Sequence, residues 1–374
     1  MRDPAHLRDE FLIDPDVVFL NHGSFGACPR DVLARCQKWQ LELERQPVEF
    51  LGRRLDGLLA EARAALGTYV GADPHDLVFV PNATTGVNLA AWGLALQRGD
   101  EVLSTSLEYG AMDLAWEHIC AHAPARYVRM PVTLPVESDE QVVEEVWRGV
   151  TERTRALFLS HVTSETALRL PVQELCRRAR DRGIRTVVDG AHVPGQLPLD
   201  LAALDVDYYA GNCHKWLCAP KGAGFLYVRR DLQAEIQPLV VSWGHGGDAK
   251  FLARHEKQGT RDPSPFLTVP AAIEWQREHD WDAVRARCRD LAARTPARLG
   301  LEPLGPPGLQ MVSMRLPVGA PPDLKEKLYD DHRIEIPVWE NGTIRASFHG
   351  YNGEDDLEAL AEALAATLAT RAAG

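Results

Sequence analysis

Lys215 stands in a context that favours covalent chemistry. It follows a short strand expected at residues 207–210 and lies within residues 212–216, Asn-Cys-His-Lys-Trp, ahead of a glycine-rich stretch. A lysine held among apolar neighbours has a lowered pKa, and its neutral amine can attack a carbonyl carbon to form a Schiff base. The ordinary alternative is a solvated surface lysine. By itself the residue is therefore only a candidate nucleophile.

Two other segments could hold an anion and a ring nitrogen. Residues 80–86, Val-Pro-Asn-Ala-Thr-Thr-Gly, indicate a strand-to-helix junction, where free N–H groups and the helix dipole favour a phosphate. A threonine N-cap without a ligand is the alternative there. Asp189 follows a strand expected at 186–188, and an acid at such a strand end could hold a metal, a ribose hydroxyl or a protonated ring nitrogen. An Asp-Gly surface turn is the alternative for this residue.

The elements that must position these residues alternate regularly along the chain. Short, buried-type strands are expected at residues 77–80, 101–105, 156–160, 186–188, 207–210 and 225–228. Between them lie helical stretches such as 172–182, whose apolar residues share one face. Strands that alternate with helices predict an α/β fold with a mostly parallel sheet covered by helices.

The pattern changes after residue 262. The expected elements there are a long helix, a Gly/Pro break, two strands and a closing helix, at residues 271–299, 305–308, 310–316, 343–348 and 354 to about 372. We therefore expect a large domain at 26–262 and a smaller α+β domain at 263–374, with an amino-terminal segment, 1–25, packed on the small domain.

On this scaffold the segments together resemble the class V aminotransferase family of fold-type I enzymes that use pyridoxal 5′-phosphate (PLP). Within it they resemble the isopenicillin N epimerase-like branch. Residues 19–27 are similar to the amino-terminal signature of that branch, and 189–192 and 212–216 are similar to its cofactor motifs. The resemblance extends through residues 345–352 and so spans nearly the whole chain. It implies the fold of a fold-type I PLP-dependent transferase.

The resemblance also implies roles for single residues. Lys215 would carry PLP as a Schiff base and later remove the α-proton of the substrate, while Asp189 would pair with the ring N–H. Tyr109 would stack on the ring, and we count it with these two as catalytic. The further cofactor-binding residues that the resemblance implies are Ala83, Thr84, Thr163, His192, Asn212, His214 and Thr260.

Substrate contacts and assembly are implied in the same way. Arg345 resembles an arginine that grips the substrate α-carboxylate, for which its planar fork is suited. Asn21 and His22 are expected to contact the substrate as well. Thr260 resembles a threonine that reaches the phosphate from a partner subunit, which predicts a homodimer.

Two other kinds of site are disfavoured. Cys213, His214 and Cys218 have no second Cys/His pair at metal-ligand spacing, so no metal is expected. Residues 222–224, Gly-Ala-Gly, lack the full dinucleotide glycine pattern and precede a strand rather than a helix, which disfavours NAD.

The expected reaction begins with removal of the Cα proton of an amino-acid substrate by Lys215, without net transamination. We favour an isopenicillin N epimerase-like isomerase of specialised metabolism such as antibiotic biosynthesis. The sequence does not identify its second acid or base, for which Tyr109 or a histidine could be proposed. A C–S lyase that performs β-elimination on a cysteine S-conjugate or sulfoxide stays open, as do an aminotransferase and an inactive PLP-fold binding protein. Cysteine desulfuration in this family needs a mobile cysteine on a loop of the carboxyl-terminal part. It is disfavoured here, because the last cysteine, Cys288, lies in an Arg-rich helical stretch.

Composition limits the partners and the compartment. The formal charge of −12 argues against a general nucleic-acid binder. No apolar run approaches the roughly 20 residues that span a bilayer, and residues 1–4 lack the pattern of a secretion signal. Seven cysteines without a repeated spacing indicate reduced thiols. We therefore expect a cytoplasmic enzyme with a small-molecule substrate and no nucleic-acid or membrane partner.

Overall fold

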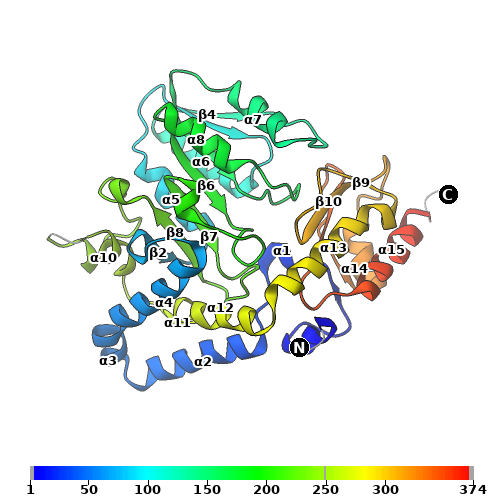
Figure 1. Ribbon diagram of the computed structural model, residues 1–374, viewed down its shortest axis with the longest axis horizontal. Helices are drawn as coiled ribbons and strands as arrows, with labels where there is room; N and C mark the ends of the chain where they lie inside the picture. The colour runs from blue at the N-terminus through cyan, green and yellow to red at the C-terminus, as the bar shows by residue number, and fades with distance from the viewer. Residues whose placement is uncertain (1–3, 248–249, 370–374) are drawn as a thin grey trace.

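A seven-stranded sheet forms the centre of the protein (Figure 1), seen in a computed structural model that describes residues 4–247 and 250–369. The sheet order is β2-β8-β7-β6-β5-β3-β4. Every neighbouring pair is parallel except those of β8, which runs antiparallel to β2 and β7. The strands are β2 (Leu77–Val80), β3 (Glu101–Thr105), β4 (Arg126–Met130), β5 (Thr154–Ser160), β6 (Arg185–Gly190), β7 (Tyr208–Asn212) and β8 (Gly224–Val228).

Helices cover both faces of this sheet, because side chains that alternate along each strand form two separate apolar cores. In β2, Val78 and Val80 pack into the core that α5 (Ala83–Gly93) and α6 (Gly110–His122) share. Leu77 and Phe79 point into the opposite core, with α4 (Leu55–Val70) and α8 (Val172–Asp181). The predicted α/β fold with a mostly parallel, covered sheet is thereby confirmed.

All six strands expected for this region are present, but one strand was missed. Strand β4 lies at the edge of the sheet and pairs with β3 alone. Its Arg126 and Arg129 are exposed, so the segment lacks the apolar run by which a buried strand is detected.

Shorter elements connect the sheet to its surroundings. They are η1 (Pro4–Glu10), α1 (His22–Phe25), α2 (Arg30–Arg45), α3 (Pro47–Glu49), η2 (Phe50–Arg54), η3 (Pro74–Asp76), α7 (Asp139–Trp147), α9 (Leu201–Leu204), η4 (Arg230–Leu232), η5 (Trp243–His245), α10 (Phe251–Glu256) and α11 (Ser264–Leu267). Among the helices of the described residues, none combines the length and the apolar content that crossing a bilayer requires.

The carboxyl-terminal part contains a second sheet, of order β12-β10-β9, which lies to one side of the central sheet (Figure 1). Its elements are β9 (Glu302–Pro303), β10 (Met311–Arg315), α14 (Leu324–His332), β11 (Ile334–Glu335), β12 (Thr343–Ser347) and α15 (Glu354–Ala369). Strand β1 (Val18–Phe19) pairs in parallel with β11, so the amino-terminal segment contacts this part. The domain boundaries at 25/26 and 262/263 stay predictions, and residues 1–3 and 370–374 of the expected outer parts lie outside the described residues.

The single helix expected at 271–299 is two helices instead. Helix α12 (Val269–Glu278) ends before Asp280, and α13 (Trp281–Leu299) begins after it. Asp280 has a φ of 46°, in the left-handed region that interrupts a right-handed helix and that Asp tolerates better than most residues. Hydrophobic periodicity continues across the break, which is why the sequence pattern did not show it.

The carboxyl ends of the parallel strands meet at one edge of the central sheet, and the candidate residues follow these ends. Close packing of α5 on β7 places the start of that helix beside the end of β7. Gly86 permits this approach, because a Cβ at this position would lie 2.8 Å from the Cβ of Ala210. A larger residue would push the helix start away from the strand.

Gly26 brings the amino-terminal segment against the loop that carries Lys215. Its φ is 70°, and a Cβ built on it would lie 2.2 Å from the carbonyl oxygen of His214 and 2.8 Å from Lys215 Cα. Both the left-handed conformation and the contact with rigid backbone therefore require glycine.

Gly26→Ala is expected to lower the free energy of unfolding by about 2–4 kcal/mol, because the backbone must leave a conformation that alanine does not favour and separate two packed segments. Urea-unfolding midpoints measure the effect. Gly52→Ala is the matched control, since a Cβ at Gly52 meets nothing within 4 Å. Equal midpoints for Gly26→Ala and the parent protein would contradict this account of the contact.

Candidate active site

A cavity of about 180 Å³ lies at the carboxyl edge of the central sheet. This volume is below the range usual for drug-sized ligands and suits one substituted ring better than a dinucleotide. Eight of the residues singled out from the sequence line it together: Ala83, Thr84, Tyr109, Asp189, His192, Asn212, His214 and Lys215. The roles assigned to them stay predictions, but their convergence makes this cavity the candidate site.

Lys215 lies in the loop after β7, and its Nζ is 3.2 Å from His192 Nε2. Burial lowers the pKa of this amine to about 8, and the positive charge of Arg345 adds to the effect while Asp189 opposes it. A lysine with such a pKa has a substantial neutral fraction near pH 8, which is the form that attacks a carbonyl carbon.

Asp189 is the penultimate residue of β6 and is only 5% exposed. Its Oδ1 accepts a hydrogen bond from the Ala191 N–H at 2.9 Å, and within the described residues Oδ2 has no hydrogen-bond donor. Burial raises the pKa of this carboxyl, whereas the Ala191 N–H and the charge of Lys215 lower it. The carboxylate therefore has one free oxygen for a cationic N–H of a ligand.

The first turn of α5 provides an anion cradle. Asn82, rather than a threonine, is the N-cap, because its Oδ1 accepts the Thr85 N–H at 2.8 Å. Asn212 Oδ1 accepts the Ala83 N–H at 2.7 Å, and its Nδ2 has no acceptor within the described part of the chain. Thr84 is exposed to the cavity, and its N–H belongs to the first turn, where a helix offers no internal acceptor. These donors suit a phosphate.

His214 is more restricted than its predicted role requires. Its Nδ1 lies 3.0 Å from the carbonyl oxygen of Ala223, so Nδ1 carries a proton and donates it. Burial lowers the pKa of this ring to about 4. Nε2 can donate to a phosphate only when the ring is protonated, and a bound anion would favour that form.

Arg345, on β12, is a buried cation without a carboxylate partner. It is 1% exposed, and no Asp or Glu of the described residues lies within ion-pair distance of it. Its two terminal nitrogens donate to the Ser164 carbonyl oxygen and, at 3.2 Å, to Ser24 Oγ, while Nε has no partner. Its guanidinium also lies 5.4 Å from the centre of the Trp339 ring.

Burial lowers the pKa of Arg345 to about 10. A buried guanidinium without a carboxylate partner is suited to bind the carboxylate of a ligand.

Arg345 and the remaining predicted residues are not among the residues that line the cavity. Thr163 is fully buried, and its hydroxyl bonds to Thr166 at 2.7 Å and accepts the Leu168 N–H at 2.8 Å. Asn21 bonds to Glu335 at 3.0 Å. Thr260 lines a different cavity. Their predicted contacts with cofactor and substrate stay predictions.

His22 lies directly behind the lysine loop and is fully buried. Its Nε2 is 3.1 Å from the carbonyl oxygen of Lys215 and its Nδ1 is 2.8 Å from the Tyr351 hydroxyl, so both ring nitrogens have protein partners. Burial lowers the pKa of His22 to about 3. In this arrangement the ring supports the backbone of Lys215, and its predicted substrate contact stays a prediction.

His22, Cys218 and His349 form a buried cluster in which one potential metal-ligand atom of each residue lies within 4.8 Å of the others. The two imidazole rings are stacked, with centroids 3.7 Å apart and planes inclined by only 7°. A ligated metal ion lies near the plane of each imidazole, and two nearly parallel, stacked planes do not meet at one ion. The cluster is instead a hydrogen-bonded unit, with Cys218 Sγ 3.3 Å from His349 Nε2.

Sequence reasoning missed Glu108, which precedes Tyr109. The carboxyl is buried and accepts hydrogen bonds from Thr105 Oγ1 at 2.7 Å and from the Ser160 N–H at 2.8 Å. Burial raises its pKa to about 7, against the effect of these bonds, and the charge of Asp189 raises it further. The available signal was an acid just after a strand end at 101–105. Ser24 and Ser164, which bind Arg345, were missed as well because short polar residues carry no pattern of their own.

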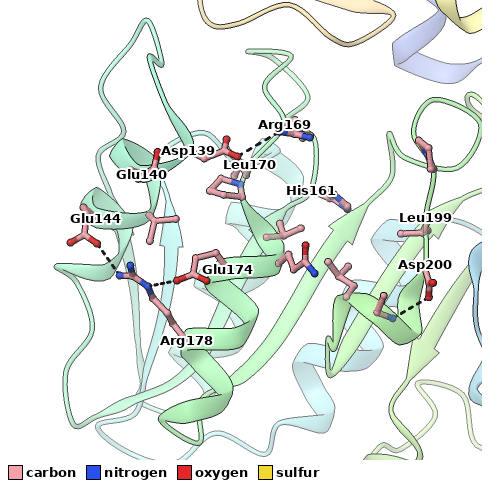
Figure 2. A pocket seen from close by; sticks show the side chains of 17 residues that line it. Asp139, Glu140, Glu144, His161, Arg169, Leu170, Glu174, Arg178, Leu199 and Asp200 are labelled. Atoms are coloured by element: carbon pink, nitrogen blue, oxygen red, sulfur yellow. Dashed lines mark hydrogen bonds and ion pairs between the residues drawn. The ribbon is translucent and has the colours of Figure 1, made fainter.

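A larger cavity, of about 720 Å³, lies elsewhere on the chain (Figure 2). Arg178 forms ion pairs there with Glu144 and Glu174, both at 2.9 Å, and Arg169 approaches Asp139 at 3.5 Å. These arginines are thus already paired with carboxylates of the protein. None of the predicted site residues lines this cavity, so its size does not make it the active site.

The cavity at Lys215 fits PLP. The free oxygen of Asp189 suits a pyridinium N–H, the start of α5 suits a phosphate, and Lys215 provides an amine for a covalent link. Fold and site therefore define a PLP-dependent enzyme of fold type I. A family model described as aminotransferase class-V matches residues 18–304, and the chain belongs to that family.

Known proteins resemble the chain over nearly its full length. An isopenicillin N epimerase from Amycolatopsis lactamdurans is 42% identical, covering 96% of this chain and 97% of its own. An L-cysteine desulfhydrase from Arabidopsis thaliana is 29% identical, covering 93% and 87%. Among solved structures, the cystine C–S lyase C-DES, with glycine covalently linked to its PLP cofactor, is 26% identical with a TM-score of 0.84 and coverage of 96% and 98%.

Lys215→Ala is expected to abolish covalent retention of PLP, because no other described residue that lines the cavity carries an amine. Intact-mass spectrometry after borohydride reduction measures this, since reduction makes the link to a lysine permanent. Lys221→Met is the matched control, six residues along the same loop, with its amine bonded to the Gly26 carbonyl oxygen at 2.8 Å. Retention of the cofactor mass by Lys215→Ala would refute the assignment.

Proposed function

We propose that this enzyme epimerises an amino-acid substrate at Cα, as an isopenicillin N epimerase-like isomerase of specialised metabolism. The observation that carries the proposal is the 42% identity to an isopenicillin N epimerase over nearly both chains. PLP, when bound, supplies an electron-withdrawing ring that stabilises negative charge at Cα. The residues of the cavity then determine which group moves the proton.

Each role follows from the state of a side chain. Arg345 binds the α-carboxylate of the substrate, because it is a buried cation whose Nε has no hydrogen-bond partner among the described residues. Lys215 removes the Cα proton on one face, since burial lowers its pKa to about 8 and so gives a substantial neutral fraction near that pH. Asp189 holds the ring N–H of the cofactor through its free oxygen.

Inversion needs a second group that returns a proton to the opposite face of Cα. We assign this role to Tyr109, which lines the cavity and is 48% exposed. Its phenol can donate a proton to Cα; afterwards the phenolate regains a proton from solvent, and Lys215 releases to solvent the proton that it removed.

β-Elimination is the second candidate. The likeness to a cystine C–S lyase and to a cysteine desulfhydrase favours it, and it needs Cα deprotonation with loss of a sulfur group from Cβ. A desulfurase route through a mobile cysteine is not proposed, because Cys288 is fully buried in α13 and burial raises the pKa of its thiol to about 12.

Three further proposals concern assembly and location. We propose a homodimer in which Thr260 reaches the phosphate site of the partner subunit, a cytoplasmic location, and domain boundaries near residues 25 and 262. The exposure of Thr260 in a cavity separate from that of Lys215 supports the first. The oligomeric state and the loss of cofactor affinity in Thr260→Ala test it.

Incubation with candidate amino acids in deuterated water distinguishes the reactions. Epimerisation is expected to place deuterium at Cα with inversion, measured by mass spectrometry and chiral chromatography. Release of an oxoacid with a thiol would support the lyase, and conversion of the cofactor to its amine form would support an aminotransferase. Lys215→Ala is the control, because it lacks the group that removes the proton.

Arg345→Gln is expected to lower kcat/KM by about 10²–10³-fold, because a buried charge pair with the substrate carboxylate is lost. Thermal stability should not fall with it, since the variant removes a buried cation that has no carboxylate partner. The control is Arg315→Gln, a half-exposed arginine on β10 next to β12. Unchanged kcat/KM in Arg345→Gln would remove this residue from substrate binding.

A further inference from the structure

The imidazole of His192 lies between the side-chain nitrogens of two adjacent residues of the chain, Lys215 and Trp216. Trp216 Nε1 lies 3.2 Å from His192 Nδ1, and Lys215 Nζ lies 3.2 Å from His192 Nε2. His192 is 2% exposed and Trp216 is fully buried, so solvent competes little for either ring nitrogen. The three side chains therefore form one hydrogen-bonded row.

The indole N–H determines where His192 carries its proton. An indole nitrogen can only donate, so Nδ1 of His192 must accept and cannot bear a hydrogen. Burial lowers the pKa of His192 well below its usual value, and the charges of Lys215 and Arg345 lower it further. The ring is therefore neutral, and its single proton lies on Nε2.

We propose that Trp216 is a positioning residue that fixes this tautomer of His192, so that the imidazole presents an N–H group, and not a lone pair, to Lys215. No part of the proposal depends on which reaction the enzyme catalyses, since it concerns the state of the lysine and its partner in any of them.

The tautomer affects the protonation of Lys215. An ammonium group at Lys215 would face the Nε2–H of His192, donor against donor, whereas a neutral amine can accept from it. Trp216 therefore acts through His192 to favour the neutral amine. The same Nε2–H can donate to an anionic oxygen, such as the phenolic oxygen that PLP carries beside its aldehyde group.

The position of Trp216 is fixed from several sides. Its carbonyl oxygen accepts a hydrogen bond from Gln276 Nε2 at 2.7 Å. Gly195 packs on the same peptide, where a Cβ would lie 2.1 Å from that oxygen. The His22 ring lies 4.9 Å from the indole, centroid to centroid. A side chain anchored in this way can hold the histidine in one tautomer.

Other charged groups also shift the pKa values of Lys215 and His192, and the test must leave those groups unchanged. Arg345 lowers and Asp189 raises the pKa of Lys215. Lys215, Arg345 and His22 all lower that of His192. None of these residues is replaced in Trp216→Phe, so these charges are the same in the variant and in the parent.

The experiment compares Trp216→Phe with the parent holoenzyme. Nitrogen-15 NMR of labelled histidine reports which ring nitrogen of His192 is protonated, with the signal assigned by its loss in His192→Gln. We expect Nε2 to be protonated in the parent and Nδ1 to become protonated, wholly or in part, in Trp216→Phe. The pH midpoint of the visible absorbance of the bound cofactor should rise by about half a unit or more. The reason is that the Nε2–H of His192, which favours the unprotonated lysine nitrogen, is no longer always present.

Trp281→Phe is the matched control. This indole is also buried, at 6% exposure, and donates to a backbone acceptor, the Gly195 carbonyl oxygen, at 2.9 Å. The control loses one hydrogen bond and the same side-chain volume but leaves His192 untouched. Its nitrogen-15 spectrum and its midpoint should match those of the parent.

A double-mutant cycle separates positioning from general damage to the fold. In the His192→Gln background, where a side-chain amide replaces the imidazole, Trp216→Phe should shift the midpoint no further. The same shift with and without His192 would overturn the proposal. So would protonation of Nδ1 in the parent protein, a result that needs no variant to fold, or an unchanged tautomer in Trp216→Phe.

Discussion

Two positive charges with too few carboxylates govern this site, Arg345 buried and Lys215 partly buried. Lys215 and Arg345 lie close enough that Arg345 lowers the pKa of Lys215, and only Asp189 opposes it. A pKa of about 8 in place of 10.5 means that the protonated lysine costs the folded state about 3 kcal/mol. Between pH 8 and pH 10.5 the lysine is protonated in the unfolded chain but largely neutral in the folded protein. The cost to the free energy of unfolding is therefore present in full below about pH 8 and is lost as the pH rises toward 10.5. An anionic ligand relieves it at neutral pH.

A rigid framework is what allows such charges to stay buried. Arg345 projects from β12, while its partner Ser24 belongs to α1 and Ser164 to the loop after β5. The pairing of β1 with β11 and the hydrogen bond from Ser347 N–H to the Leu20 carbonyl oxygen join the amino-terminal segment to the second sheet. Segments far apart in sequence therefore hold the arginine in place.

Much of this arrangement could be predicted from the sequence. The strands before Asp189 and Lys215 are apolar runs, and the rule that parallel strands end at the same edge brings the two residues together. The anion cradle at Ala83 followed from a different signal, the strand-to-helix junction at residues 80–86 and its helix dipole. What the sequence could not show were contacts between distant segments, such as the burial of Arg345 without a carboxylate, the bond of Asn212 to the start of α5, and the carboxyl of Glu108 between β3 and β5. These depend on three-dimensional packing, which leaves no periodic signal.

The row of Trp216, His192 and Lys215 shows why adjacency in sequence is a poor guide to role. Consecutive side chains of an extended strand point to opposite faces, so Lys215 and Trp216 would not reach one ring from regular β structure. The loop after β7 turns back on itself instead: Cys218 donates its N–H to the Lys215 carbonyl oxygen and has a left-handed φ of 63°. His22 Nε2, which lies 3.1 Å from that same carbonyl oxygen, fixes the turn. A strained turn, held from behind by a buried histidine, thus lets two neighbouring residues act on both nitrogens of His192, and strain of this kind is typical of functional loops.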